Sequence, residues 1–281
     1  MGYAVVLTTA SKANATGGTF ADSLSANSGD SLAVSNYLQG GARVIEAWGI
    51  DSDSAAEGQI FYTRPESTHD QSHGVRFEIP ALFPGGAAAV AAHNILPGYA
   101  GLPVYAGDSA TIQFSCTAAD DLVMSYQTEY DDLPGASAQF ATWEQVKNLR
   151  KSDMGNNVVA VASATPGAYG ASRAINADDD RFHANTYYAI LGFTVQTPVT
   201  TIAISGPAFG GFKIGAPAGV LNLDTTWYWV DQSMKYGKGM IPVFNSNDKG
   251  NMLVFIADGE ASTSPKVDFH YYELTGNPVG G

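Results

Sequence analysis

Met124-Ser125-Tyr126-Gln127-Thr128-Glu129 and Val267-Asp268-Phe269-His270-Tyr271-Tyr272 share one alternating pattern, 143 residues apart (269 − 126). Upstream, the segments Leu102-Pro103-Val104-Tyr105 and Ile241-Pro242-Val243-Phe244 repeat in the same order. The anchor pairs and their offsets are Pro103 and Pro242 (139), Phe114 and Phe255 (141), and Tyr126 and Phe269 (143). Since these offsets are close to half of the 281 residues, the sequence predicts an internally duplicated fold.

Alternation of apolar and polar residues, which is typical of half-buried β-strands, continues through both halves. Gly49 and Gly192, also 143 residues apart (192 − 49), extend the repeat towards the start of each half. We expect about seven to eight short strands per half, the content of one jelly roll. The predicted fold class is all-β, with two tandem jelly-roll β-sandwiches and a short helix in the connector.

Less regular segments divide the chain into four parts. Residues 1–30, rich in Ser, Ala, Asn and Gly, are expected to form an N-terminal arm. Residues 31–133 form the first predicted jelly roll and residues 186–281 the second. Residues 134–185 form a connector that contains a helix and the start of the second unit.

The connector has the clearest helix signal. Thr142 and Gln145 have the spacing of a capping box. Apolar residues then recur every three positions, at Trp143, Val146 and Leu149. We expect a helix over residues 140–151 and a strand over residues 158–162. An Ala-rich segment, residues 87–93, is a second candidate for a short helix.

Composition excludes several classes of protein. The chain carries 27 acidic and 14 basic residues, so its net charge of −13 disfavours direct binding to nucleic acid. Cys116 is the single cysteine, which excludes an intrachain disulfide framework. No apolar stretch is long enough for a transmembrane helix, and the N-terminus lacks the pattern of a signal peptide. Charged residues make up only 15% of the chain, which suggests surface covered by neighbouring subunits.

Two short patterns resemble metal sites. His69 and His73 are four residues apart, but they lie between strand patterns, so a solvated loop is the preferred interpretation. Asn176, Asp178 and Asp180 match the first half of a calcium loop, which then fails at Arg181 and Tyr187. A looser calcium site at residues 178–180 stays open, beside the alternative of an acidic turn.

Motifs for catalysis are absent or incomplete. The carboxylate pairs Asp120-Asp121 and Asp131-Asp132 lie at turns, where neighbours in sequence need not face one bond. Ser172 lacks the second glycine of a nucleophile elbow, and Gly237-Lys238-Gly239 lacks the Ser or Thr of a P-loop. Cys116 alternates with Phe114 and is expected to face the core. No catalytic, cofactor-binding or metal-binding residue is therefore predicted.

The aromatic residues indicate an alternative function, the binding of carbohydrate or of a receptor. In a strand over residues 227–230, Trp227 and Trp229 share one face and Tyr228 lies on the other, which suits a core or subunit-interface role or else a sugar platform. Trp48 is a further candidate. A tandem β-sandwich that binds carbohydrate or a receptor, such as a phage fibre or a lectin, is the alternative function. A β-sandwich hydrolase is a third class, without the expected motifs.

The duplicated strand pattern, with Pro103/Pro242, Phe114/Phe255 and Tyr126/Phe269 as its anchors, resembles the double-jelly-roll major capsid proteins of icosahedral viruses, including bacteriophages. The resemblance covers residues 31–275 and is architectural. It implies a homotrimer with a pseudo-hexagonal footprint that tiles the shell of a virion, after assembly in the host cytoplasm. The implied partners are neighbouring capsomers, minor capsid or penton proteins and an internal membrane, without cofactors and without direct nucleic-acid binding.

Overall fold

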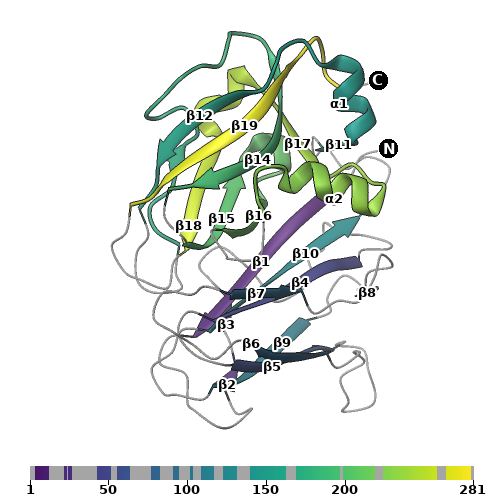
Figure 1. Ribbon diagram of the computed structural model, residues 1–281, viewed down its shortest axis with the longest axis vertical. Coiled ribbons are helices and arrows are strands. Elements are labelled where there is room, and N and C mark those ends of the chain that lie inside the picture. The colour runs from purple at the N-terminus through teal and green to yellow at the C-terminus, as the bar shows by residue number, and fades with distance from the viewer. Residues whose placement is uncertain are drawn as a thin grey trace.

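The computed structural model describes residues 4–12, 22–23, 25–26, 43–51, 56–63, 77–82, 91–94, 102–103, 109–116, 123–131, 140–162, 169–196, 199–218, 224–257 and 264–279. Up to residue 131 the described residues lie in strands. From residue 140 onwards they also form loops and two short α-helices. The strands form four antiparallel sheets, in agreement with the predicted all-β class (Figure 1).

The first two sheets, which we call the first unit, are built from the N-terminal half. One has the order β3-β1-β10-β4-β7, with β8 also paired to β4, and the other has the order β2-β9-β5-β6. The strands are β1 (Ala4–Lys12), β2 (Asp22–Ser23), β3 (Ser25–Ala26), β4 (Arg43–Asp51), β5 (Ala56–Thr63), β6 (Phe77–Leu82), β7 (Ala91–Asn94), β8 (Leu102–Pro103), β9 (Ser109–Cys116) and β10 (Val123–Asp131).

The other two sheets, the second unit, have the orders β11-β17-β14-β19-β12 and β13-β18-β15-β16. The strands are β11 (Phe140–Ala141), β12 (Gly155–Ala160), β13 (Arg173–Ala174), β14 (Tyr187–Val195), β15 (Val199–Ser205), β16 (Lys213–Ala218), β17 (Ile241–Asn245), β18 (Leu253–Ala257) and β19 (Lys266–Leu274). The helices are α1 (Trp143–Leu149), α2 (Tyr228–Tyr236) and the 3-10 turns η1 (Pro207–Phe209) and η2 (Ser246–Asn251).

Both units connect their strands in the same way. In chain order, β1, β2, β4, β5, β6, β9 and β10 take the places that β12, β13, β14, β15, β16, β18 and β19 take in the second unit. The place of β17, beside β14, is filled in the first unit by the two short strands β7 and β8, both beside β4. The order of four strands in one sheet and four in the other is therefore repeated along the chain.

The pairing register matches as closely as the order. Strand β19 has the bounds of β10 shifted by 143 residues, the offset of the Tyr126 and Phe269 anchors. Tyr126 lies opposite Trp48, and Phe269 lies opposite Phe193, so each unit has an aromatic cross-strand pair at the same place.

Two of the matched pairs need a correction of two residues. Because Trp48 is equivalent to Phe193, Gly49 is equivalent to Thr194 and not to Gly192. Pro103 pairs with Arg43, which is equivalent to Tyr188. Because Tyr188 pairs with Phe244, Pro103 is equivalent to Phe244 and not to Pro242. A shift of two residues leaves the alternation intact, so the sequence pattern alone cannot detect it.

The core of the second unit is closed between its two sheets. Alternate residues of β19 (Val267, Phe269 and Tyr271) face inwards and are nearly inaccessible, as are Phe193 and Phe244. The loop before β14 adds to this aromatic core, since the rings of Phe182 and Tyr188 lie 4.9 Å apart. Burial of this apolar and aromatic surface is the main stabilising term for the unit.

Helix α1 covers the outer face of the larger sheet and begins as the sequence predicts. The hydroxyl of Thr142 accepts a hydrogen bond from Gln145 N, and Gln145 Oε1 accepts one from Thr142 N, so the capping box is complete. The helix is shorter than the expected span of residues 140–151, because Phe140–Ala141 pairs with β17 as a strand.

Four other local expectations change. Within residues 1–30, placed in an arm, residues 4–12, 22–23 and 25–26 lie in β1, β2 and β3, and β1 pairs with β10 along its whole length. Residues 91–93, expected in a helix, lie in β7. The segment from Trp227 to Val230, expected as a strand, begins helix α2. The stretch 206–219, whose glycine-rich composition is typical of a loop, contains η1 and β16. None of the helices in the described ranges is long and apolar enough to cross a membrane.

Candidate functional site

The polar and charged side chains of the second unit form two clusters beside β12 and β19, one at the loop of residues 175–183 and one around Glu273. The first loop, residues 175–183, is held by Asn157, which is fully buried on β12. Asn157 Nδ2 donates to Ile175 O and Asp179 O at 2.7 and 2.9 Å, and its Oδ1 accepts from Arg181 N. A buried amide with these bonds is satisfied, so its role is to fix the loop over the edge of the sheet.

The three carboxylates of this acidic turn each have a cationic partner. Asp178 pairs with Arg173 at 2.7 Å, Asp179 with Arg181 at 2.7 Å, and Asp180 with Lys249 at 2.6 Å. Burial acts to raise the pKa of Asp180, but the hydrogen bonds from Lys249 and Asn176 hold it below the ordinary value. Within the described ranges no group of three His, Cys, Asp or Glu side chains is arranged to hold a metal ion. The three carboxylates are therefore engaged in the ion pairs of an acidic turn.

The second cluster surrounds Glu273, a nearly buried carboxylate near the end of β19. Lys151 Nζ lies 2.5 Å from Glu273 Oε1, and His183 Nδ1 lies 3.1 Å from Oε2. The hydrogen bond from Lys151 is the main reason that the pKa of Glu273 lies below its ordinary value, and the bond from His183 acts in the same direction. This Glu273 cluster joins the loop after α1, the acidic-turn loop and β19.

A carboxylate beside an imidazole also occurs in nucleophilic catalysis, so the neighbours of the Glu273 cluster decide its chemistry. The nearby hydroxyl of Ser152 donates to Asp153 O at 2.8 Å and accepts from Glu273 N at 3.2 Å. It is therefore engaged with backbone rather than with His183, whose ring is 75% exposed. The Glu273 cluster therefore fits a structural role, in which it holds three segments of the second unit together.

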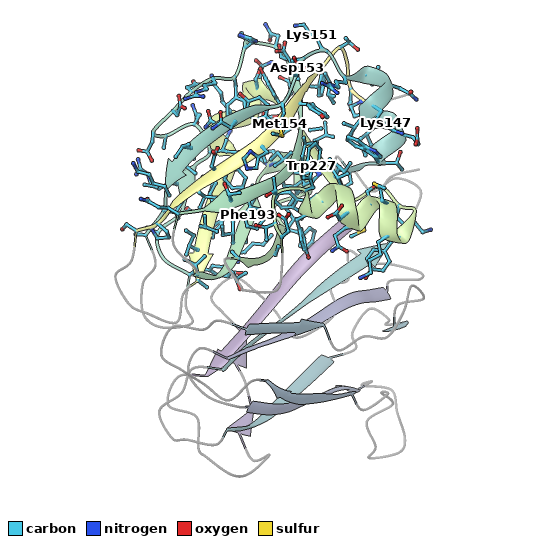
Figure 2. All side chains as sticks on the ribbon, in the orientation of Figure 1. Lys147, Lys151, Asp153, Met154, Phe193 and Trp227 are labelled. Carbon is cyan, nitrogen blue, oxygen red and sulfur yellow. The ribbon has the colours of Figure 1, made fainter. Side chains whose placement is uncertain are left out.

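The basic residues near α1 are also paired within the unit. Lys147 bonds to Glu144 at 2.6 Å, and Arg150 bonds to Asp153 at 2.7 Å while its guanidinium lies over the ring of Tyr272. Lys151 and Asp153 lie at the end of the second unit farthest from the first unit (Figure 2). These cations, the densest basic cluster in the sequence, do not form an open site for phosphates.

The aromatic residues of the sugar-platform hypothesis are packed rather than displayed. Tyr228 and Trp229 are 3% and 2% exposed, and Trp229 lies against Phe193. Trp227 is half-buried and contacts Trp143 and Tyr272 at ring distances of 6.2 and 6.3 Å. Trp227 therefore joins α1 and α2 over Tyr272, and Trp229 fixes α2 to Phe193, which agrees with the core role.

Other candidates take ordinary places or lie outside the described residues. Ser172 is half-buried directly before β13, and Gly237 ends α2 with a φ of 64°, as a helix C-cap. Cys116 ends β9. The candidates that fall outside the described residues are His69, His73, Asp120, Asp121 and Asp132.

The sequence analysis did not identify the Glu273 cluster, although one signal was present. Along β19 the inward positions Val267, Phe269 and Tyr271 place Glu273 next on the same face. A carboxylate at an apolar position of an alternating strand needs partners. The identity of those partners, which come from 122 and 90 residues away, is not encoded locally.

Comparison with known proteins gives distant structural likeness only. No protein-family model matches the sequence, and no curated protein matches it. Among solved structures, the PBSX exported protein XepA has a TM-score of 0.23 at 11% identity, over 96% of this chain and 86% of that one. The STIV MCP has a TM-score of 0.23 at 10% identity, over 97% of both chains. The VP2 subviral particle of infectious bursal disease virus has a TM-score of 0.19 at 13% identity, over 99% of this chain and 74% of that one.

Proposed function

We propose that this protein is the major capsid protein of an icosahedral virus, with two tandem jelly rolls and a homotrimeric, pseudo-hexagonal capsomer. The observation that carries the proposal is the repeated strand order. When β3 and β11 are left out and β7 and β8 are counted as one position, each unit has eight strand positions along the chain. The first, eighth, third and sixth are adjacent in one sheet, and the second, seventh, fourth and fifth in the other. That order, eight strands in two sheets of four, is the connectivity of a jelly roll.

Two equivalent units in one chain suit a particular assembly. Three copies related by a threefold axis place six similar units around a ring, which gives near-sixfold packing from one gene product. We assign residues 1–131 to the first unit and residues 140–281 to the second. Neighbouring capsomers, a penton or minor capsid protein and an internal membrane are the partners that this role implies, with localisation in the virion after assembly in the host cytoplasm.

The chemistry of the second unit supports a structural role. The charged groups at the acidic turn and at Glu273 are used in pairs that hold loops, and the nearby Ser152 hydroxyl bonds to backbone. The burial of Tyr228 and Trp229 gives no support to the carbohydrate-binding alternative. A glycan array tests that alternative directly, because saturable sugar binding by wild-type protein would favour it.

The assembly state tests the capsid proposal. Size-exclusion chromatography with multi-angle light scattering should give about 88 kDa, three times the chain mass of 29.4 kDa. Negative-stain electron microscopy of the same fraction should show particles with a hexagonal outline. A protein that stays monomeric at micromolar concentration across pH and salt conditions would overturn the proposal.

A further inference from the structure

Strand β16 is at the outer edge of its sheet, yet it is covered. Outermost strands normally present free backbone groups to solvent and need protection. The described residues of β16 are all buried, including Ile214 and Ala216 at 0% and Lys213 at 9% exposed. Strand β1 of the first unit lies against β16 (Figure 1). The first unit therefore protects the edge of the second unit within one chain.

The equivalent edge of the first unit lies far from the described strands of the second unit (Figure 1). By the repeated order, β6 is the equivalent of β16, and β12 is the equivalent of β1. Strands β6 and β12 lie at opposite ends of the molecule, so they cannot meet within one chain (Figure 1). In a closed ring, each copy presents β12 to the next copy, whose β6 is at the outer edge of its sheet.

We propose that β12 of one copy packs against β6 of the next, repeating between copies the contact that β1 and β16 make inside one chain. This inference rests on the proposed trimer and adds the strands through which its copies meet. The contact is heterologous, because two different strands take part, and three such contacts close the ring.

The outward face of β12 is uncharged, beside an edge whose backbone is already capped at Ala160 by Asp178 and Arg173. Its outward side chains, Asn156, Val158 and Ala160, are uncharged and only half-buried. Strand β12 ends its sheet, with β19 on its other side. Uncharged side chains at a strand edge can be desolvated by a neighbouring strand without leaving a buried charge.

Charge decides which substitution on β12 tests the contact. The two arginines that border β12, Arg173 and Arg181, are paired with Asp178 and Asp179. Residues 1–139 hold 15 of the 27 acidic but 4 of the 14 basic residues, a net charge of −11 (4 − 15). A carboxylate added to the uncharged face of β12 would therefore face an acidic first unit, whereas an added amine would not be repelled.

Opposite charges placed at Val158 test the contact. Val158→Glu sets a carboxylate against the acidic unit and should weaken the trimer by about tenfold or more in its dissociation constant. Val158→Lys, of similar length, should retain the trimer. Thr194→Glu, on an exposed position of the same sheet face in β14, is the matched control and should also retain it. Circular dichroism melts of all three variants confirm folding.

Cysteine cross-linking gives an independent readout. In a Cys116→Ser background, Val158→Cys combined with Ile79→Cys should give disulfide-linked trimers under mild oxidation, whereas Val158→Cys alone should not. Equal trimer stability of Val158→Glu and Val158→Lys, together with no cross-link across a Cys scan of residues 77–82, would overturn the contact while leaving the trimer intact. A monomeric wild type would instead overturn the proposed function.

Discussion

The two units share strand order and register, yet they differ in charge and in what covers their sheets. Residues 140–281 hold 12 acidic and 10 basic residues, against 15 and 4 in residues 1–139. Among the described residues of the second unit, six Lys or Arg side chains pair with acids, at Lys147–Glu144, Arg150–Asp153, Lys151–Glu273, Arg173–Asp178, Arg181–Asp179 and Lys249–Asp180. The first unit has too few cations for the same neutralisation, so a shared scaffold supports two different surfaces.

The second difference is an inserted helix. In the first unit only residues 95–101 separate β7 from β8 along β4. In the second unit Thr225 takes the place beside β14, since Phe193 N donates to Thr225 O and Thr225 Oγ1 donates to Phe193 O. Helix α2 then intervenes before β17. The core strands therefore keep the repeat, while the connections between them diverge.

Removing the aromatic cross-strand pair should have the largest effect. Phe193 is fully buried against Trp229 and Phe269, so Phe193→Ala should lower the free energy of unfolding by about 3–5 kcal/mol. Because Trp48 takes the equivalent place opposite Tyr126, Trp48→Ala should cost a similar amount. Urea unfolding followed by circular dichroism measures both. A Trp48→Ala cost below about 1 kcal/mol would break the equivalence of the two cores.

Gly192 has no glycine at its equivalent place in the first unit, so substituting it compares the packing of the two units. A Cβ on Gly192 would collide with the carbonyl oxygens of Thr225 and Thr226, which pass directly over it. The register makes Ala47 the equivalent of Gly192, so the first unit already has a Cβ there. Gly192→Ala should therefore cost about 1–3 kcal/mol in urea unfolding.

The matched control for Gly192→Ala is a substitution in the first unit. Gly49→Thr should be nearly neutral, because Thr194 is exposed at the equivalent place. If Gly49→Thr destabilised the protein as much as Gly192→Ala, the two-residue correction to the repeat would be wrong.

Local signals in the sequence predicted more of the fold than of the clusters. The capping box at Thr142 and the Tyr126/Phe269 anchor depend on neighbours a few residues away, and both are found in the structure. The strand predicted for Trp227 to Val230 was wrong. Bulky aromatic residues favour strands, but packing against β14 and β17 stabilises a helix there. The partner of Asp180, Lys249, lies 69 residues away, and only the folded topology brings the two together.

The Glu273 cluster, which is built on the second unit alone, gives a pH-dependent difference. Glu273→Gln removes the charge that Lys151 and His183 face and should cost about 2 kcal/mol at neutral pH. Since the folded pKa of Glu273 lies below its ordinary value of 4.5, the folded state binds the proton less tightly than the unfolded state. This stabilisation is complete above the ordinary value and is lost as pH falls through the folded pKa.

Urea unfolding of wild type and Glu273→Gln at pH 7 and at successively lower pH measures this loss. The gap between the two proteins should close on acidification. A gap that stays constant would assign the cost to packing and not to the carboxylate. Lys151→Gln should reproduce part of the gap at pH 7, because its amino group is the main cause of the lowered pKa of Glu273.

The smallest expected effect concerns α1, for which the described residues of the first unit have no equivalent. Thr142→Ala removes the acceptor for Gln145 N and should cost about 1 kcal/mol. Thr142→Ser keeps the hydroxyl and should restore most of it. Because α1 rests on Trp227 and Tyr272 through Trp143, amide hydrogen exchange should rise within α1 and leave β10 and β19 protected. Exchange that rose equally in both units would mean that the helix supports the whole chain and not the second unit alone.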